Sequence, residues 1–342
     1  MSTLSSIEQQ LEGFRKDFET LKREIGKAIV GQDAVIDGVL TAIIAGGHVL
    51  VEGPPGYGKT ALCRALGDTV QLGFQRIQFT PDLMPADLIG TYVVMENQQG
   101  RRTFEFQQGP IFNNIIMADQ INRGMPKTQS ALLEAMEGDQ ITVSRESFEL
   151  PKPFVVIATQ NPLEMEGTFP LPEPQIDRFL YKVVAVTPTP EEMLEILERT
   201  TEFELPPVAS VLNDRRLIEM RDIARRVPVD GSARMAAVTM VAATSPGYDK
   251  APAEIKRYVQ YGSSPRGAQA LILGAKVLAA SQARNLVTLD DIKTAARPAL
   301  RHRLILNFEG QAEAVSPDTL VDAVVQSVSS TKSKAPAPPT EA

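Results

Sequence analysis

The stretch GPPGYGKT, residues 53–60, decides how the rest of this sequence folds. It fits the pattern G-x-x-x-x-G-K-[ST], with a strand-like apolar run (48–52) before it and a helix-like run (60–68) after it. Its glycines let the backbone curl so that N–H groups point toward phosphate oxygens, and the positive end of the following helix adds to that attraction. The stretch therefore predicts a phosphate-binding loop in an α/β fold.

Two residues of this loop and one acid farther along the chain predict a magnesium–nucleotide site. Lys59 is expected to reach the β- and γ-phosphates, and the Thr60 hydroxyl is expected to hold Mg²⁺. Asp119 ends the apolar run 115–118, and an acid at a strand tip supports the same ion, usually through water. We expect ATP or ADP and Mg²⁺ as cofactors. The predicted nucleotide-binding residues of the loop are Gly53, Pro54, Pro55, Gly56, Tyr57, Gly58, Lys59, Thr60 and Ala61.

Strand-like and helix-like runs alternate between residues 29 and 190, which predicts a mostly parallel sheet flanked by helices. Two segments interrupt this alternation, and each is expected to hold a hairpin. The first hairpin pairs 91–95 with 102–106 after a short helix (86–89), and the second pairs 140–143 with 148–150. The expected strands of the main sheet are 48–52, 74–79, 115–119, 154–159 and 180–185.

Outside the α/β region, residues 4–28 and 191–306 are expected to be helical. Pro188-Thr-Pro190 breaks the α/β pattern, and residues 191–306 show helical patterning without a convincing strand. Apolar positions that alternate spacings of three and four predict a helix over 4–28, either packed on its own domain or in a short coiled-coil contact. The polar, Pro-rich tail 329–342 is expected to be disordered.

The bulk composition argues against several classes of protein. The chain has 342 residues, a net charge of −7 and a sequence pI of about 5.2, which argues against a nucleic-acid protein that works through bulk positive charge. A single cysteine, Cys63, excludes a disulfide framework and, with two distant histidines, argues against a zinc site. No signal-like N-terminus and no apolar run of membrane-spanning length are present, so we expect a cytoplasmic location.

Five ordered motifs resemble the MoxR family of AAA+ ATPases, and the resemblance runs from about Ile29 to Leu306. The motifs are GPPGYGKT (53–60), MADQINRGMPKTQSALLEAME (117–137), ATQNP (158–162), EPQIDRF (173–179) and GSSPRGAQALI (262–272). The resemblance implies a P-loop AAA+ core with a parallel sheet flanked by helices, followed by an all-α lid domain. The implied domains are the core (1–189), the lid (190–306) and a C-terminal extension (307–342).

Both interruptions of the core also match the family. Residues 81–110 resemble the insert in helix 2 that marks this branch, and residues 138–153 resemble the hairpin that precedes sensor 1. In relatives such loops project toward the ring pore or the remodelled partner. The alternative is a surface hairpin without a contact role.

The resemblance implies roles for residues outside the loop. Gly31 and Gln32 match the segment that lies against the adenine. Asn161 matches sensor 1, a polar residue at a strand tip that orients the attacking water. Arg178 matches the arginine finger, which reaches the nucleotide of the next subunit and neutralises charge on the transferred phosphoryl group.

Two further arginines are candidates. Arg266 matches sensor 2, which reaches from the lid to the γ-phosphate. Ser264 and Pro265 are expected to be the N-cap and first residue of a helix, which places Arg266 in its first turn. Arg123 lies just past the aspartate and is a candidate contact across a subunit interface. The plain alternative for each of these residues is a turn former or a surface side chain.

Position 120 departs from the family pattern. The residue after the aspartate is normally Glu, the general base for the attacking water, but this chain has Gln120. An amide keeps nearly the same shape and can bond a water, yet it lacks useful basicity. We therefore expect hydrolysis to fall by on the order of 10²–10⁴-fold while binding survives. Either a designed Glu→Gln change that traps the ATP state or a natural, slowly hydrolysing variant explains this residue. The expected catalytic residues are Gln120, Asn161, Arg178 and Arg266.

The function that the resemblance implies is ATP- and Mg²⁺-dependent, chaperone-like remodelling or activation of a partner protein complex. Because Arg178 acts in trans, we expect a ring, a hexamer. Relatives often act with a partner that carries a von Willebrand factor A domain, so we expect such a partner here. Three other functions stay open: a magnesium-chelatase-like motor subunit, a nucleic-acid motor, and a non-hydrolysing ATP-gated scaffold. The hairpin 138–152 argues against the second, because its acidic side chains offset its basic ones.

Overall fold

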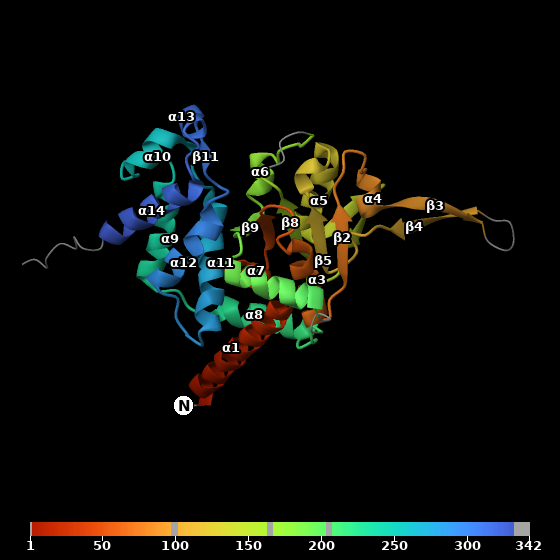
Figure 1. Ribbon diagram of the computed structural model, residues 1–342, viewed down its shortest axis with the longest axis horizontal. Helices are drawn as coiled ribbons and strands as arrows, with labels where there is room; N and C mark the ends of the chain where they lie inside the picture. The colour runs from red at the N-terminus through yellow and green to blue at the C-terminus, as the bar shows by residue number, and fades with distance from the viewer. Residues whose placement is uncertain (1, 97–101, 163–166, 203–206, 332–342) are drawn as a thin grey trace, which may run out of the picture. The chain divides into compact units, whose positions relative to one another are not determined.

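The computed structural model describes residues 2–96, 102–162, 167–202 and 207–331 (Figure 1). The chain forms two compact units, which we call the core unit (Glu12–Ile223) and the helical unit (Met1–Leu11 with Ala224–Ala342). Helix α1 (Ser2–Ala28) begins in the helical unit and continues into the core unit. The core unit continues past the break predicted at residues 188–190.

A parallel sheet of five strands organises the core unit, in the order β2-β5-β8-β1-β9. Each strand lies within one residue of its predicted position. The strands are β1 (His48–Glu52), β2 (Phe74–Gln78), β5 (Ile115–Asp119), β8 (Val155–Gln160) and β9 (Phe179–Val184). Helices α2 (Asp33–Ala45) and α3 (Lys59–Val70) pack on these strands. The sequence prediction of a parallel α/β sheet is therefore confirmed.

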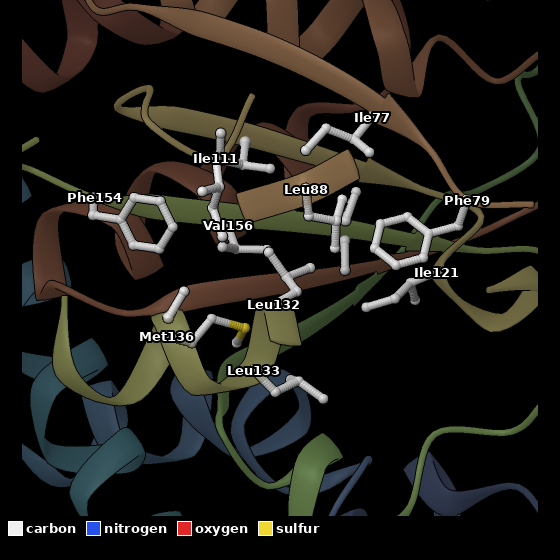
Figure 2. Packing of buried hydrophobic residues seen from close by; sticks show 14 of the residues in the cluster. Ile77, Phe79, Leu88, Ile111, Ile121, Leu132, Leu133, Met136, Phe154 and Val156 are labelled. Carbon is white, nitrogen blue, oxygen red and sulfur yellow. The ribbon is translucent and has the colours of Figure 1, made fainter. Parts of the chain in front are cut away.

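The centre of the sheet is apolar on both faces, as expected of parallel strands covered by helices. Every residue of β5 is buried, and so are the first five residues of β8. Helix α5 (Pro126–Gly138) closes one face, and Figure 2 shows its Leu132 beside Val156 of β8 and Leu88 of α4 (Pro85–Ile89). This packing fixes the strand ends from which the polar residues of the pocket project.

Both predicted hairpins are present in the core unit. β3 (Gly90–Glu96) pairs antiparallel with β4 (Arg102–Gln108), and Figure 1 shows this hairpin projecting far from the sheet. β6 (Gln140–Val143) pairs with β7 (Glu146–Glu149). The turn of the first hairpin, residues 97–101, lies outside the described residues.

The remaining elements of the core unit are short, apart from the helix that leads out of it. Thr189 caps α7, since its hydroxyl accepts the Glu192 N–H (3.2 Å) while the Glu192 carboxylate accepts the Thr189 N–H (2.8 Å). The elements are the 3₁₀ turn η1 (Ile121–Arg123), α6 (Glu173–Ile176), α7 (Pro190–Leu197), the π-helical turn η2 (Glu198–Glu202) and α8 (Asp214–Arg226), which continues into the helical unit.

The helical unit packs α11 against α9 and α12. Its helices are α9 (Gly231–Ala243), α10 (Ala253–Tyr258), α11 (Pro265–Ser281), α12 (Leu289–Leu300), α13 (Phe308–Ala312) and α14 (Pro317–Thr331). The prediction that no strand occurs between residues 191 and 306 is wrong, because β10 (Val259–Tyr261) pairs antiparallel with β11 (Ile305–Leu306). Strands this short carry no alternation that a sequence pattern reveals.

The tail that was predicted to be disordered from residue 329 begins inside a helix, α14 (Pro317–Thr331). Residues 332–342, the rest of that tail, lie outside the described residues. Within the described ranges, none of the helices has the length and apolar character needed to cross a membrane.

His48, at the start of β1, is a buried polar residue that joins three elements. Its Nδ1 accepts the Val156 N–H (3.0 Å), and its Nε2 donates to the Met136 carbonyl of α5 (3.2 Å). Burial lowers the pKa of His48 from 6.5 to about 4, so the ring is neutral in the folded chain. Protonation must disrupt one of these hydrogen bonds or leave a charge in the core.

This burial predicts a pH-dependent stability. The folded-state pKa of His48 is below its unfolded value, so stability is fully present above pH 6.5 and is lost as the pH falls toward about 4. Between pH 7 and pH 5 we expect the free energy of unfolding to drop by about 2 kcal/mol through this group. His48→Gln should be less stable at pH 7 and should lack this drop. Urea unfolding of both proteins at pH 7 and pH 5 measures this drop in the free energy of unfolding. An equal drop in the two proteins would show that His48 does not cause it.

Candidate functional site

A pocket of about 470 Å³ lies at the carboxyl ends of β1, β5 and β8. In a parallel sheet these ends meet at one edge, which is where such folds bind ligands. The pocket brings together the phosphate loop, Asp119, Gln120 and Asn161, as the sequence motifs require. Its lining residues are Pro55, Gly56, Tyr57, Gly58, Lys59, Thr60, Ala61, Arg76, Asp119, Gln120, Thr159, Gln160 and Asn161.

The phosphate loop is held by its glycines and by Lys59. Gly56 and Gly58 have φ angles of 86° and 71°, in the left-handed region that glycine adopts without strain. The Lys59 ammonium donates to the carbonyls of Gly53 (2.7 Å) and Pro54 (2.6 Å), across the loop from its own backbone. Helix α3 begins at Lys59, and the residues of its first turn, Lys59, Thr60 and Ala61, line the pocket wall, where the positive end of the helix dipole lies. The loop therefore offers backbone donors, a helix end and a cation to an anion.

Asp119 is held from both sides at the tip of β5. Its Oδ1 accepts the Thr159 hydroxyl (2.6 Å), and its Oδ2 accepts Nε (3.1 Å) and Nη2 (2.6 Å) of Arg76. The carboxylate is nearly buried, and these two partners replace hydrogen bonds that it would otherwise make with water. The sequence reasoning missed both partners. A charged residue in the edge strand β2 and a threonine two residues before Asn161 were the available signals.

Gln120 adopts a backbone conformation that is costly for a residue with a side chain. Its φ and ψ are 53° and 51°, a left-handed geometry that disfavours non-glycine residues by about 1–2 kcal/mol. Its N–H donates to the Thr159 hydroxyl oxygen (2.9 Å), and its Oε1 accepts from Nη1 of Arg123 (3.3 Å). The Thr159 hydroxyl therefore bonds both the Asp119 carboxylate and the Gln120 N–H. These two bonds fix the turn that places Gln120 at the pocket wall.

The donor set of the pocket suits Mg²⁺. Thr60 and Asp119 both line it, and hydroxyl and carboxylate oxygens are ligands that Mg²⁺ accepts together with phosphate oxygens and water. Burial, with a smaller contribution from the Asp119 charge, raises the pKa of Cys63 to about 12. That thiol stays protonated and is excluded as a metal ligand or nucleophile. No cluster of three or more His, Cys, Asp or Glu side chains occurs among the residues that the structure describes.

Gly31 and Gln32 lie in the core unit but do not line the pocket. The Gln32 amide donates to the Val186 carbonyl (2.7 Å) and accepts the Val186 N–H (3.2 Å), so it ties the start of α2 to the segment after β9. A Cβ at Gly31, where φ is 72°, would lie 2.6 Å from the Glu192 carboxyl carbon. Glycine at this position therefore has a structural reason that is independent of any ligand.

The two arginines predicted to act on phosphate lie on other elements. Arg178 donates to the Leu133 carbonyl (2.5 Å) and pairs with Glu137 (3.0 Å), both on α5. Arg266 lies in the first turn of α11 in the helical unit, where the Ser264 hydroxyl accepts its N–H (3.2 Å). The predicted N-cap is thereby confirmed, while the roles of Arg178 and Arg266 toward a nucleotide stay predictions.

Comparisons with known proteins identify the family of the chain. Residues 48–181 match the ATPase family associated with various cellular activities (AAA), and residues 252–324 match the AAA lid domain. The chain is 38% identical to Chaperone MoxR1 of Mycobacterium tuberculosis over 320 residues, which cover 93% of this chain and 84% of that protein. It is 31% identical to Protein MoxR of Methylorubrum extorquens over 356 residues, covering 96% and 99% of the two chains. A solved structure from Cytophaga hutchinsonii, assigned as an ATPase, has a TM-score of 0.87 at 37% identity and covers 96% of this chain and 98% of that one.

The double role of Thr159 yields a prediction. Thr159→Val keeps the shape of the side chain but removes the partner of both the Asp119 carboxylate and the Gln120 N–H. Leaving such groups unpaired costs about 1–3 kcal/mol each, so we expect urea unfolding to show a loss of that order. Thr159→Ser retains the hydroxyl and serves as the control, with less than half the loss. Equal losses in the two variants would assign the effect to packing instead.

Proposed function

This chain belongs to the MoxR family of AAA+ ATPases, and on that premise we propose that it binds ATP with Mg²⁺ in this pocket and uses the nucleotide to remodel or activate a partner protein complex. The observation that carries the proposal is the meeting of the phosphate loop, Asp119 and Gln120 in one pocket. The mycobacterial relative is named a chaperone, which agrees with this activity.

The phosphate loop, Thr60, Asp119 and Asn161 each have a task in the proposed binding. The N–H groups of the loop and of the first turn of α3 bond the phosphate oxygens, and Lys59 turns from the loop carbonyls toward the β- and γ-phosphates. Thr60 and Asp119 would hold Mg²⁺, which would supply positive charge to neutralise the phosphates. Asn161 orients water near the γ-phosphate through its amide. None of these tasks needs a base at position 120.

Proton removal from the attacking water is the step that Gln120 does not perform. A carboxylate at this position would be ionised at neutral pH and would accept the proton, whereas an amide only orients the water. We therefore infer that the chain as written holds ATP and hydrolyses it slowly. The left-handed backbone and the bond to Thr159 hold position 120 at the pocket wall, so a glutamate there inherits the same placement.

This inference is tested by restoring the acid. Gln120→Glu should raise steady-state ATP hydrolysis by on the order of 10²–10⁴-fold, while ATP affinity stays within a few-fold. Lys59→Ala in the Gln120→Glu background is the control and should lose nucleotide binding. Equal hydrolysis by the chain and by Gln120→Glu would show that the base lies elsewhere.

We propose further that the active assembly is a ring, a hexamer, in which Arg178 completes the site of the neighbouring subunit. Two facts support this role. Arg178 does not line the pocket of its own chain, and its side chain, whose guanidinium is bonded to α5, is partly exposed. A planar guanidinium suits a transferred phosphoryl group because it presents several donors to spread charge.

A mixing experiment tests the action in trans. In the Gln120→Glu background, Arg178→Ala and Lys59→Ala should each be inactive alone, the first for want of the arginine and the second for want of binding. Mixed in equal amounts with ATP and Mg²⁺, they should regain a measurable fraction of activity, since intact sites form between unlike subunits. Sedimentation under the same conditions should show the ring. No recovery from a mixed ring would place Arg178 in its own site.

The partner side of the function is supported by the hairpins. The ring of Phe106 (β4) stacks on Phe148 (β7) with centroids 4.3 Å apart, and the Tyr92 hydroxyl donates to Glu146 (2.6 Å), so the hairpins are joined. The far part of the first hairpin exposes apolar side chains, with Phe104 74% exposed, which suits contact with a protein. We propose that the partner carries a von Willebrand factor A domain. We also propose that the protein acts in the cytoplasm, where a single free cysteine such as Cys63 stays reduced.

A further inference from the structure

Arg76 is a charged residue of the pocket to which neither the phosphate-loop motif nor the family motifs assign a role. It lies in the edge strand β2, and its guanidinium bonds Asp119 Oδ2 through Nε (3.1 Å) and Nη2 (2.6 Å). The same Nη2 also donates to Oε1 of Gln78 (3.3 Å). Its Nη1 has no hydrogen bond to any residue within the described part of the chain, and the side chain is 43% exposed. Arg76 is therefore anchored on one side only and remains able to move.

The ion pair occupies one oxygen of the carboxylate that the proposed function assigns to Mg²⁺. Thr159 takes the other oxygen as a neutral donor, so Arg76 is the cation that compensates the charge of Asp119. A polyphosphate in this pocket without a metal would lie near an acid, and like charges a few ångströms apart repel strongly where water is largely excluded. Arg76 offsets that repulsion, but it also competes with a metal ion for the same carboxylate.

We propose, on the basis of the proposed function, that Arg76 is a resident counter-cation that sets how strongly nucleotide binding depends on Mg²⁺. While Arg76 is paired with Asp119, the pocket can bind a nucleotide that carries no metal ion. The same ion pair lowers the affinity of Asp119 for the metal. When Mg²⁺ shares the carboxylate, Arg76 releases Oδ2 and turns on its exposed side toward solvent or the phosphates. Arg76 is thus a positioning residue, since it acts through Asp119 and not on the reacting atoms.

The consequence concerns a ratio of affinities, which binding alone measures. Without Arg76, the negative charge of Asp119 has no cation beside it, so it repels the phosphates of a metal-free nucleotide. The affinity of the protein for metal-free nucleotide therefore falls. The metal complex loses less, because Mg²⁺ takes over the compensation of Asp119. The ratio of the dissociation constant in EDTA to that in Mg²⁺ therefore grows by about tenfold or more. Unit charges ~4 Å apart at an effective dielectric near 20 would give roughly 10³-fold, and solvent at the exposed side of Arg76 screens this to the smaller value.

The experiment is titration calorimetry with the non-hydrolysable analogue AMP-PNP, in EDTA and in Mg²⁺, on the chain and on Arg76→Ala. Arg64→Ala removes an exposed charge from α3 and is the matched control, with an unchanged ratio. Arg76→Lys should retain most of the effect of the arginine. Thermal unfolding confirms that each variant is folded, and Arg76→Gln replaces Arg76→Ala if the latter is not.

A double-mutant cycle separates this role from direct phosphate contact. In an Asp119→Asn background the acid is gone, so Arg76→Ala should no longer change the ratio. A tenfold rise in the ratio that vanishes in this background supports the inference. An equal loss of affinity in EDTA and in Mg²⁺, or a loss that persists with Asp119→Asn, overturns it and makes Arg76 a phosphate ligand. If the unmodified chain binds no AMP-PNP in either buffer, the proposed function fails, and the inference fails with it.

Discussion

The position of the Asp119 carboxylate between the Thr159 hydroxyl and the Arg76 guanidinium is the constraint on which the rest of the pocket depends. An ionised acid at the end of a buried strand is unfavourable without hydrogen bonds and a counter-charge. The sheet provides both because β2 and β8 lie on either side of β5. The same threonine holds the N–H of Gln120, so the turn after β5 is fixed by the group that fixes the acid.

The sequence predicted those parts of the fold and site that repeat a known local pattern. The phosphate loop, the strand ending on Asp119 and the N-cap at Ser264 are contiguous, and their residues fold locally as their chemistry requires. The sheet strands were predictable because buried parallel strands are uninterrupted apolar runs. The two-residue strand β11 and the helical extension to Thr331 were not, since neither carries a pattern of sufficient length.

What the sequence did not reveal is pairing between distant residues. Arg76 and Asp119 are 43 positions apart, and Gln32 and Val186 are 154 apart, so only the fold brings each pair together. Gln32 was assigned to the nucleotide from its motif alone. In the structure, the nitrogen and the oxygen of its side-chain amide both bond the backbone of Val186. A residue assigned to a ligand by its motif can therefore have a full structural role, and the two are separated only by measuring binding in a variant.

We propose that the chain retains nucleotide recognition and lacks the base for hydrolysis. Lys59, Thr60 and Asp119, to which we assign recognition, line the pocket, whereas an amide at position 120 does not accept a proton. The two hairpins, which contact each other through Phe106 and Phe148, belong to the same core unit as the pocket. The second hairpin ends with β7, and the next strand in the chain is β8, which carries Thr159. We propose that a pocket held in one nucleotide state also holds these joined hairpins in one arrangement.

The most direct test is the identity of the nucleotide that the chain retains. The protein is incubated with ATP and Mg²⁺, separated rapidly from unbound nucleotide by gel filtration, denatured, and its nucleotide is resolved by ion-exchange chromatography. The account predicts ATP in close to stoichiometric amount, with ADP appearing only over a much longer incubation. ADP as the retained nucleotide at the earliest time would contradict the account, because it would show that the chemistry proceeds without an acid at position 120.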